Sequence, residues 1–404
     1  MRFFVLKWIP LLLLASFFVL QGCASEDTTG VTDDEIVIGS WGPLTGPAAL
    51  WGAVPRGMDA YFQMINEEGG IHGRQIRFIY RDDGYEPPRT VSAVRQMVQN
   101  DQVFAFVGGV GTAPGMAVKN FILDNQIPWV SPASGSTHWA YPPQDNLFST
   151  FPLYTDDAAI QINYAVEELG LSRFAIIYQN DDYGRGGLIG AEMALEKHGL
   201  EFVTRVSTEI MDSDLTSHAA RLRESGAEAV LLWVLPRQAA IITGTTAVMG
   251  YRPQWIASST LSDMPLMYDI TDGRWEGVIF TTFGEMHDSD SELAVRYRQA
   301  LATHQPGERW GTFSAAGFIF AEPMVQALRD AGPDLTRESF VEAMANIHDF
   351  QGIGAPISFS DGRQGTRSLY LVRCTGPLEY EILSDYISSD LDINEAISRL
   401  GVRR

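Results

Sequence analysis

Two loops rich in glycine and hydroxyl side chains are the parts of this sequence best suited to bind a small molecule. The first, 108–112, ends at Thr112, and the second, 131–136, contains Ser134 and Ser136. Each loop follows a short apolar run that predicts a buried strand. Backbone N–H groups, hydroxyls and a helix N-terminus at such loops suit a carboxylate or another small anion. Small residues are equally typical of tight α/β turns, so the loops alone leave both interpretations open.

Few other residues have the types and spacing that catalysis or metal binding requires. Carboxylate pairs occur at Asp82-Asp83 and Asp181-Asp182, each after a predicted strand, where aspartates most often cap helices or bond to loop N–H groups. The seven histidines lie apart, without the spacing of a metal-binding pair. The sequence has neither a nucleophile elbow nor a Walker loop. We therefore expect a protein that is not an enzyme and that uses no cofactor or metal.

The elements that would position the two loops form two similar series of strands and helices. Strands are predicted at 35–40, 76–80, 104–108 and 127–130, and again at 174–178, 202–206, 230–235 and 253–257. Strand, loop, helix and strand in this order make a right-handed crossover unit, and ligands collect beyond the carboxyl ends of such strands. The predicted fold is therefore α/β, with two doubly wound parallel-sheet lobes.

Three β-rich segments lie between these units and predict crossings from one lobe to the other. They are 147–151, 278–283 and 356–359. Three crossings imply that each lobe is built from discontinuous sequence and that a hinge spans an interlobe cleft. The predicted organisation is a signal peptide at 1–22, a tether at 23–34, an N-terminal lobe from 35–150 and 280–356, a C-terminal lobe from 151–279 and 357–386, and a C-terminal tail at 387–404.

The start of the chain predicts export and membrane attachment. Arg2 and Lys7 precede an apolar run, 8–20, that is typical of a signal peptide and too short for a membrane span. The residues Leu20-Gln21-Gly22-Cys23 resemble the lipobox of bacterial lipoproteins, in which the cysteine is acylated and becomes the first mature residue. We expect Cys23 to hold a lipid anchor at the cell envelope, on its periplasmic or extracytoplasmic side. Ordinary secretion with a free cysteine is the alternative.

The composition excludes several classes of protein. Removing Arg2 and Lys7 with the signal peptide leaves 27 basic residues against 50 acidic ones, a net charge of −23. Nucleic-acid binding needs a basic face, so it is not expected. Cys374 is the only cysteine besides Cys23, which leaves no pair for an internal disulfide. No later segment is long and apolar enough to span a bilayer. We expect a monomeric, tethered body that binds a small molecule.

Five motifs, taken together and in order, make residues 36–382 resemble type I periplasmic binding proteins of ABC transporters, in the branch that binds leucine, isoleucine and valine. They are Gly42-Pro43-Leu44-Thr45-Gly46-Pro47, Gly69-Gly70-Ile71-His72-Gly73, Asp82-Asp83, Ser131-Pro132-Ala133 and Asp182-Tyr183-Gly184. The resemblance implies two α/β lobes with three crossings and a cleft that closes on its ligand. It also implies delivery of that ligand to an ABC transporter permease in the membrane.

The resemblance further implies a binding site for the ligand's carboxylate. The family's carboxylate-binding hydroxyl falls on Thr112, and its backbone-contact alanine falls on Ala133. The family's second hydroxyl, two residues after the alanine, falls on Gly135, although Ser134 and Ser136 flank it. The resemblance therefore predicts that the anion side of the site is largely kept.

The cation side departs from the family. The cleft aromatics fall on Trp51 and Tyr183, but the acid that pairs with an amino acid's ammonium group aligns with Ser259, and its partner tyrosine aligns near Leu235. A buried ammonium without a carboxylate partner would be costly. Asp263 could substitute for that acid if the loop shifts. The expected ligand is thus a branched-chain amino acid or, given Ser259, a small organic or aromatic acid or an amide.

Two other functions are compatible with the same predicted fold. A sensory ligand-binding subunit would have the same lobes but report to a membrane receptor. An envelope enzyme would use the carboxylates of the cleft, and no motif in the sequence predicts its reaction. The import-linked binding protein is the function that the sequence favours.

Overall fold

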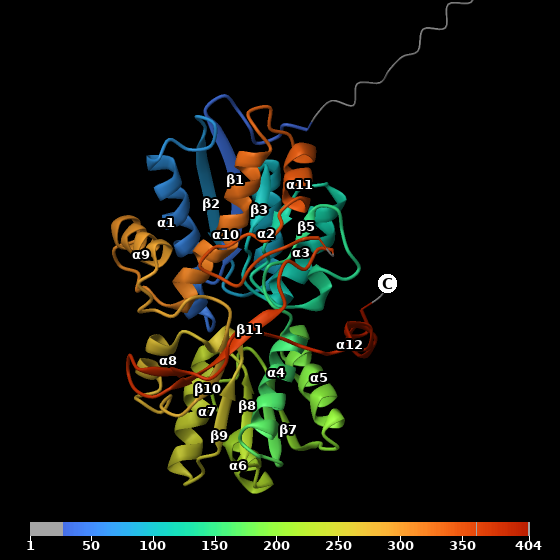
Figure 1. The fold of residues 1–404 in the computed structure, drawn as a ribbon, viewed down its shortest axis with the longest axis vertical. Helices are drawn as coiled ribbons and strands as arrows, with labels where there is room; N and C mark the ends of the chain where they lie inside the picture. Colours follow the sequence, from blue (N-terminus) through green and yellow to red (C-terminus); the bar gives the residue numbers. More distant parts are fainter. Residues whose placement is uncertain (1–26, 361, 403–404) are drawn as a thin grey trace, which may run out of the picture.

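Two α/β lobes make up the described part of the chain in the computed structural model, one above the other in Figure 1. The structure describes residues 27–360 and 362–402. The predicted signal peptide and Cys23, the predicted site of acylation, lie outside these residues. Within these two ranges, no helix is long and apolar enough to cross a membrane.

The first lobe is built on a five-stranded parallel sheet with the order β2-β1-β3-β4-β5. Its strands are β1 (Glu35–Gly42), β2 (Gln75–Asp82), β3 (Ala105–Val107), β4 (Trp129–Val130) and β5 (Leu147–Phe148). Seven of the eight residues of β1 are buried, because helices cover both faces of a central parallel strand. The helical elements of this lobe are η1 (Ala49–Gly52), α1 (Ala53–Glu67), α2 (Pro87–Gln99), α3 (Thr112–Asp124), η2 (Thr137–Trp139), α9 (Glu292–His304), α10 (Thr312–Asp330) and α11 (Arg337–Ala345).

The second lobe contains an eight-stranded sheet that is parallel in its centre and antiparallel at one edge. The order is β12-β11-β10-β9-β8-β6-β7, and β13 pairs with β11. The strands are β6 (Phe174–Gln179), β7 (Phe202–Thr208), β8 (Ala229–Trp233), β9 (Gln254–Ala257), β10 (Ile279–Thr282), β11 (Ser368–Cys374), β12 (Tyr380–Ile382) and β13 (Ile387–Ser388). The helical elements are α4 (Tyr154–Glu167), α5 (Asp182–Lys197), α6 (Thr216–Ser225), α7 (Pro236–Val248), η3 (Ser259–Leu261), α8 (Met264–Ile270) and α12 (Ile393–Leu400).

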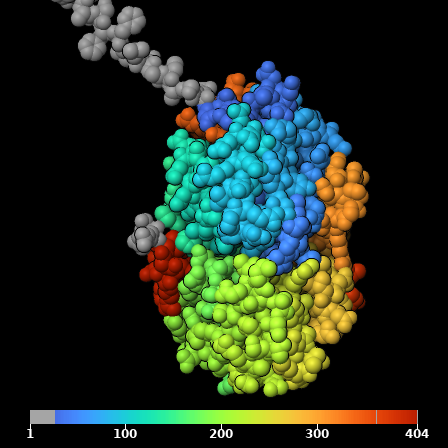
Figure 2. Space-filling model, turned by 180° about the vertical axis from the view of Figure 1, so that it is seen from behind, coloured from blue at the N-terminus to red at the C-terminus, as the bar shows by residue number. Residues whose placement is uncertain are grey.

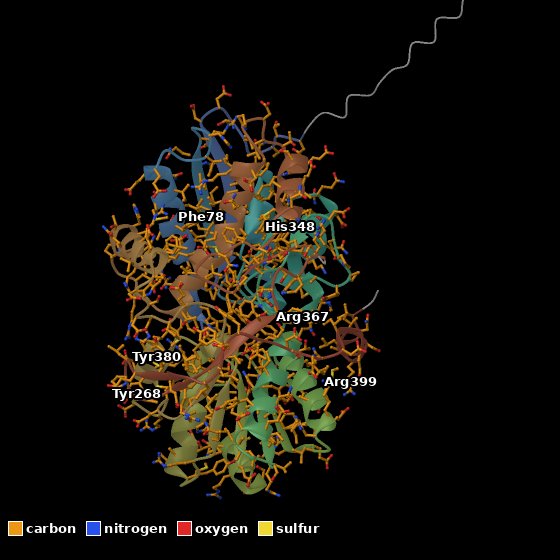
Figure 3. All side chains as sticks on the ribbon, viewed as in Figure 1. Phe78, Tyr268, His348, Arg367, Tyr380 and Arg399 are labelled. Carbon is orange, nitrogen blue, oxygen red and sulfur yellow. The ribbon has the colours of Figure 1, made fainter. Side chains whose placement is uncertain are left out.

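The chain passes between the lobes at three places that lie side by side. Ser149 bridges to Gln364, and Gly284 bridges to Gly354, so all three passing segments share one junction. Two of the three β-rich segments predicted there also contribute a strand to a sheet: β5 lies at the edge of the first sheet, and β10 belongs to the second. The third, 356–359, contributes only an isolated bridge between Phe350 and Ile357. Arg367 lies at this junction in Figure 3.

The region predicted as a C-terminal tail packs on the second lobe. Its strand β13 pairs with β11, and Ala396 and Ile397 of α12 are buried. Arg399, labelled in Figure 3, forms two hydrogen bonds of 2.8 Å with Glu196 of α5. The described part of this region therefore contributes to the lobe, because its amphipathic helix buries one face.

Candidate ligand-binding cleft

A cavity lies between the two lobes, beyond the carboxyl ends of the first-lobe strands. Its accessible volume is about 50 Å³. A single water needs roughly 10–15 Å³ on this measure, so a small organic molecule fits. Seen from behind in Figure 2, the surfaces of the two lobes touch along this waist.

The wall of the cavity is mainly aromatic, with hydroxyl groups on the second-lobe side and at the start of α10. The aromatic residues are Trp51, Tyr85, Phe151, Tyr154, Tyr183, Phe283, Phe313 and Phe320, and the hydroxyl residues are Ser259, Thr260, Ser262 and Thr312. Among the described residues that line it, none is an aspartate, glutamate, lysine, arginine or histidine. A cavity of this kind favours a ligand with an apolar body and few polar atoms.

Trp51 and Tyr183 are brought together as the sequence predicts, one from each lobe. Their rings are 6.4 Å apart at 89°, an edge-to-face arrangement. The Trp51 Nε1–H donates to the carbonyl oxygen of Thr260 at 3.0 Å, and the Tyr183 hydroxyl lies 2.7 Å from Thr260 Oγ1. The Tyr183 hydroxyl also lies 3.0 Å from the Ser258 hydroxyl. The hydroxyl loop after β9 therefore holds both aromatic side chains.

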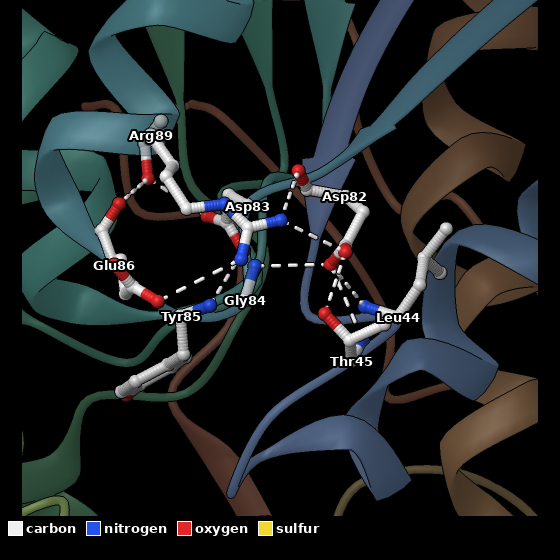
Figure 4. Close-up of polar contacts among 9 residues, drawn as sticks. Leu44, Thr45, Asp82, Asp83, Gly84, Tyr85, Glu86 and Arg89 are labelled. Atoms are coloured by element: carbon white, nitrogen blue, oxygen red, sulfur yellow. Dashed lines mark hydrogen bonds and ion pairs between the residues drawn. The ribbon is translucent and has the colours of Figure 1, made fainter.

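Asp82 fixes the loop that leads to Trp51 (Figure 4). Its Oδ1 accepts hydrogen bonds from the N–H groups of Leu44 at 2.9 Å and Thr45 at 3.2 Å, and its Oδ2 accepts one from the Thr45 hydroxyl at 2.6 Å. Arg89 donates to the same carboxylate at 2.9 Å. This aspartate at the end of β2 is thus structural, which agrees with the loop role expected from the sequence.

Asp83 holds Tyr85 in the cleft. The Tyr85 N–H donates to Asp83 Oδ1 at 2.9 Å, and the Thr90 hydroxyl donates to Oδ2 at 2.8 Å. Tyr85 has φ +64°, a left-handed conformation that is costly for this side chain and needs such support. Gly111, with φ +105°, makes room for the ring, since a Cβ there would lie 2.4 Å from Tyr85 Cε2. Burial raises the pKa of Asp83 to about 6, while its hydrogen bonds with Tyr85 and Thr90 oppose that rise.

The two loops predicted to bind a carboxylate lie side by side, but their side chains turn toward each other. The Gly111 N–H donates to the Ala133 carbonyl at 3.3 Å. The buried hydroxyls of Thr112 and Ser134 are 2.7 Å apart. Ala133 lines the cavity, whereas Thr112, Ser134, Gly135 and Ser136 do not. Ser136 instead caps η2, where its hydroxyl accepts from the His138 N–H at 3.4 Å.

Ser259, to which the family resemblance assigns the place of the ammonium-pairing acid, lies at the wall of the cavity. Its N–H donates to Asp157 Oδ2 at 2.9 Å, and Thr281 also donates to that carboxylate. Asp157 is fully buried and does not line the cavity. Burial raises its pKa to about 6, and its hydrogen bonds with Thr281 and Ser259 oppose that rise. The Asp157 carboxylate therefore holds the start of η3 on the side that faces away from the cavity.

Asp263 does not take the place of the missing acid. Its Oδ2 accepts from the Phe313 N–H at 3.0 Å and its Oδ1 from the Leu266 N–H at 3.3 Å, so it caps two helices. Leu235, which aligns near the partner tyrosine, is buried in the core and does not line the cavity. The cation side of the site is therefore uncharged.

Sequence reasoning missed most of the aromatic wall. Phe151 and Phe283 end segments that were predicted only as crossings, and Phe313, Ala316 and Phe320 come from the first turns of α10. An aromatic residue at the end of each crossing segment is a signal that could have indicated Phe151 and Phe283. For the α10 residues, helical spacing at 313, 316 and 320 predicts a buried face but not the neighbour it contacts.

Comparisons with known proteins identify the family. The model of the family described as periplasmic binding protein matches residues 35–377. Leu/Ile/Val-binding protein homolog 3 of Brucella melitensis biotype 1 is 29% identical over 330 residues, covering 81% of this chain and 86% of that protein. The structure of a fatty acid ABC transporter substrate-binding protein from Thermomonospora curvata aligns with a TM-score of 0.82 and 25% identity, covering 90% of this chain and 95% of that one.

A branched-chain amino acid ABC transporter structure from Thermus thermophilus with bound valine shares the fold. It aligns with a TM-score of 0.81 and 20% identity, covering 89% of this chain and 98% of that one. The predicted family and the predicted two-lobed α/β fold are thus confirmed. The chain belongs to the periplasmic binding protein family, with the type I fold, and is a substrate-binding protein of the ABC transporter class rather than an enzyme.

Proposed function

We propose that this protein captures a small ligand that has an apolar or aromatic body and no ammonium group, a carboxylic acid or an amide-like compound, and delivers it to the permease of an ABC importer. The observation that carries the proposal is the uncharged cavity wall, with Ser259 at the position that aligns with the family's ammonium-pairing acid. An amino acid would leave its ammonium group buried without a carboxylate partner, and burying such a charge makes the binding free energy less favourable by on the order of several kcal/mol.

The two nearby carboxylates that could have met an ammonium group are already engaged. Asp157 accepts hydrogen bonds from Ser259 and Thr281, and Asp263 accepts them from two helix N-termini. Neither lines the cavity. The similar structure from Thermomonospora curvata is that of a fatty acid ABC transporter substrate-binding protein, which supports a ligand with an apolar body and no amino group.

Membrane attachment through Cys23 is part of the proposal. Two acyl chains on that cysteine would tether the protein to the outer side of a membrane, since stable anchoring needs two such signals. The predicted tether was 23–34, but its described part is bonded to the first lobe: the Val37 N–H donates to the Gly30 carbonyl at 2.8 Å, and Arg337 donates to Asp27 at 2.7 Å. An anchor at Cys23 would therefore hold the first lobe, and with it the cleft, near the permease.

The experiment is a thermal-shift screen of the mature protein without Cys23, against amino acids, aliphatic and aromatic acids, and their amides. A ligand at 100 times its Kd stabilises the native state by about 2.7 kcal/mol, which is easily measured. We expect shifts with compounds that lack an amino group. A shift with leucine or phenylalanine that exceeds those of the matching acids and amides would contradict the proposal.

A matched pair of variants tests whether the ligand binds in this cavity. Ala316 lines the cavity on α10, whereas Ala331 lies at the partly exposed C-terminal end of the same helix. Ala316→Phe fills the cavity and should abolish the ligand-induced shift, while Ala331→Phe should keep it. Equal shifts in both variants would place the ligand elsewhere.

A further inference from the structure

The first-lobe wall of the cavity carries an inference that rests on the proposed function and narrows its ligand class by size. We propose that the ring of Tyr85 sets the upper size limit of the ligand, so that the cleft takes a compact aliphatic compound of about four carbons. Longer chains and aromatic rings are excluded because Tyr85 occupies the space that they would need.

The volume of the cavity limits the size of the ligand. It is about 50 Å³, the space of roughly three to five water molecules at 10–15 Å³ each. A dry apolar cavity that takes up benzene is larger, at roughly 150 Å³. The closed cleft therefore fits a ligand with only a few non-hydrogen atoms.

Tyr85 forms part of the wall that closes this small space. It lines the cavity and is 2% exposed. Its ring lies 5.7 Å from the ring of Trp51, at an angle of 54°. Trp51 in turn donates its hydrogen bond to Thr260 of the second lobe. Tyr85 is thus packed against the aromatic side chain that connects the two lobes.

The backbone of Tyr85 is strained, and buried hydrogen bonds hold it. Its φ of +64° is left-handed, a conformation that glycine adopts far more readily than tyrosine. The Tyr85 N–H donates to Oδ1 of the fully buried Asp83 at 2.9 Å (Figure 4). Among the seven described non-glycine residues with positive φ, Tyr85 is the one that lines the cavity. Strain that the surroundings maintain is concentrated at ligand sites, which favours a role for this ring in the cleft.

Gly111 provides the space that the Tyr85 ring enters. Its φ of +105° already requires glycine, and a Cβ there would lie 2.4 Å from Tyr85 Cε2. The next nearest atoms, Cδ and Cγ of Pro114, would lie 3.1 Å away. The space left by the missing side chain at 111 is therefore filled by Tyr85 and is not open to the ligand.

Removing the ring would enlarge the cavity directly. Because Tyr85 lines the cavity, the phenol-sized volume that it leaves would be continuous with the space for the ligand. Tyr85→Gly suits the left-handed backbone, so the enlargement does not depend on a strained replacement. Tyr85→Ala opens nearly the same space and serves as a second variant.

The test measures dissociation constants by calorimetry for straight-chain acids and amides of three to eight carbons, and for benzoate and benzamide. Affinity should rise about fourfold for each CH₂ group that the cavity can bury and should fall once the chain no longer fits. We expect the affinity of the wild-type protein to be highest at about four carbons and to be at least tenfold lower at eight.

Tyr85→Gly should move the highest affinity to about six carbons or more and should strengthen benzamide binding about tenfold. Tyr85→Phe keeps the ring and should keep the limit of the wild type. Gln126→Gly is the matched control, because Gln126 also has a left-handed φ, +54°, but is exposed and outside the cavity wall. It should bind the series as the wild type does.

Three results would overturn the inference. The first is an affinity of the wild-type protein that still rises toward eight carbons, and the second is wild-type protein that binds no member of the series. The third is an unchanged order of affinities in folded Tyr85→Gly and Tyr85→Ala, with folding checked by circular dichroism.

Failure of the proposed function has a different signature. Binding of valine more tightly than isovalerate and isovaleramide would overturn the ligand class proposed for the Ser259 side. The size limit would then be measured with amino acids, from 2-aminobutyrate to 2-aminooctanoate. A preference for the short members that Tyr85→Gly moves to longer ones would support the role of Tyr85, and an unchanged preference would overturn it.

Discussion

The indole N–H of Trp51, from the first lobe, donates a hydrogen bond of 3.0 Å to the carbonyl oxygen of Thr260, from the second. The same Thr260 also contacts the Tyr183 hydroxyl through its side chain. Thr260 of η3 therefore takes part in two hydrogen bonds, one to Trp51 of the other lobe and one to Tyr183 of its own lobe. A movement of the two lobes apart would break the bond to Trp51 and so change the wall of the cavity at Thr260.

Trp51→Phe should weaken closure while leaving the first lobe folded. The variant keeps an aromatic ring but loses the interlobe hydrogen bond, whose net value is about 1 kcal/mol. We expect affinity for the ligand found in the thermal-shift screen to fall about fivefold to tenfold, measured by calorimetry. Trp310→Phe, on the first lobe and outside the cavity wall, is the control. An equal loss in both variants would contradict a special role for the Trp51 bond.

Ser259→Glu should create affinity for amino acids. Ser259 lines the cavity and is 3% exposed, so a carboxylate there would meet a ligand's ammonium group. Without ligand the variant should be less stable, because Asp157 lies directly behind. We expect leucine to raise the unfolding temperature of Ser259→Glu but not of Ser259→Gln. If neither variant responds to leucine, Ser259 does not face the ammonium position.

The pH dependence of stability should have a component from Glu322. This buried side chain on α10 accepts from the Tyr297 hydroxyl at 2.9 Å and from the Ile353 N–H at 3.4 Å, next to the third crossing. Burial raises its pKa from 4.5 to about 8, its hydrogen bonds with Tyr297 and Ile353 oppose the rise, and the charge of Glu285 adds to it. The native state therefore holds a proton that the unfolded chain releases above pH 4.5.

The contribution of Glu322 is fully present below pH 4.5 and is lost as the pH rises toward 8. We expect the free energy of unfolding of the wild type to fall over this range, by on the order of a few kcal/mol, relative to that of Glu322→Gln. Urea titrations at pH 5 and pH 8 measure the difference. Glu342→Gln, at an exposed position of α11, should follow the wild type. Parallel behaviour of Glu322→Gln and the wild type would contradict the prediction.

Cys23→Ser should release the protein from the membrane. Without the cysteine no acyl chain can be attached, so the protein should move to the aqueous phase in detergent partitioning and lose labelling by a fatty acid. Cys374→Ser is a matched control, because Cys374 is buried in β11. An aqueous wild-type protein would show that Cys23 carries no lipid.

The sequence by itself determined the fold, the family and the edge of each sheet at which the loops gather. Short-range patterns suffice for these features: apolar runs predict buried strands, glycine marks loops, and alternation of strand and helix predicts parallel sheets. The family resemblance predicted that Trp51 and Tyr183 are aromatic residues of the cleft, and the structure adds that their rings contact each other. Ser259 and Leu235 predicted a cavity wall without a charged group on that side, which agrees with the uncharged lining of the cavity.

Only the tertiary structure decided which side chains line the cavity and which are bonded elsewhere. Thr112 and Ser134 are 22 residues apart in the chain, yet their hydroxyls lie 2.7 Å from each other and do not line the cavity. Asp263 looked available from its position, but its oxygens bond to N–H groups of Leu266 and Phe313, the latter 50 residues away. Side-chain direction and competition between partners arise from contacts that span the whole chain, so local sequence could not predict them.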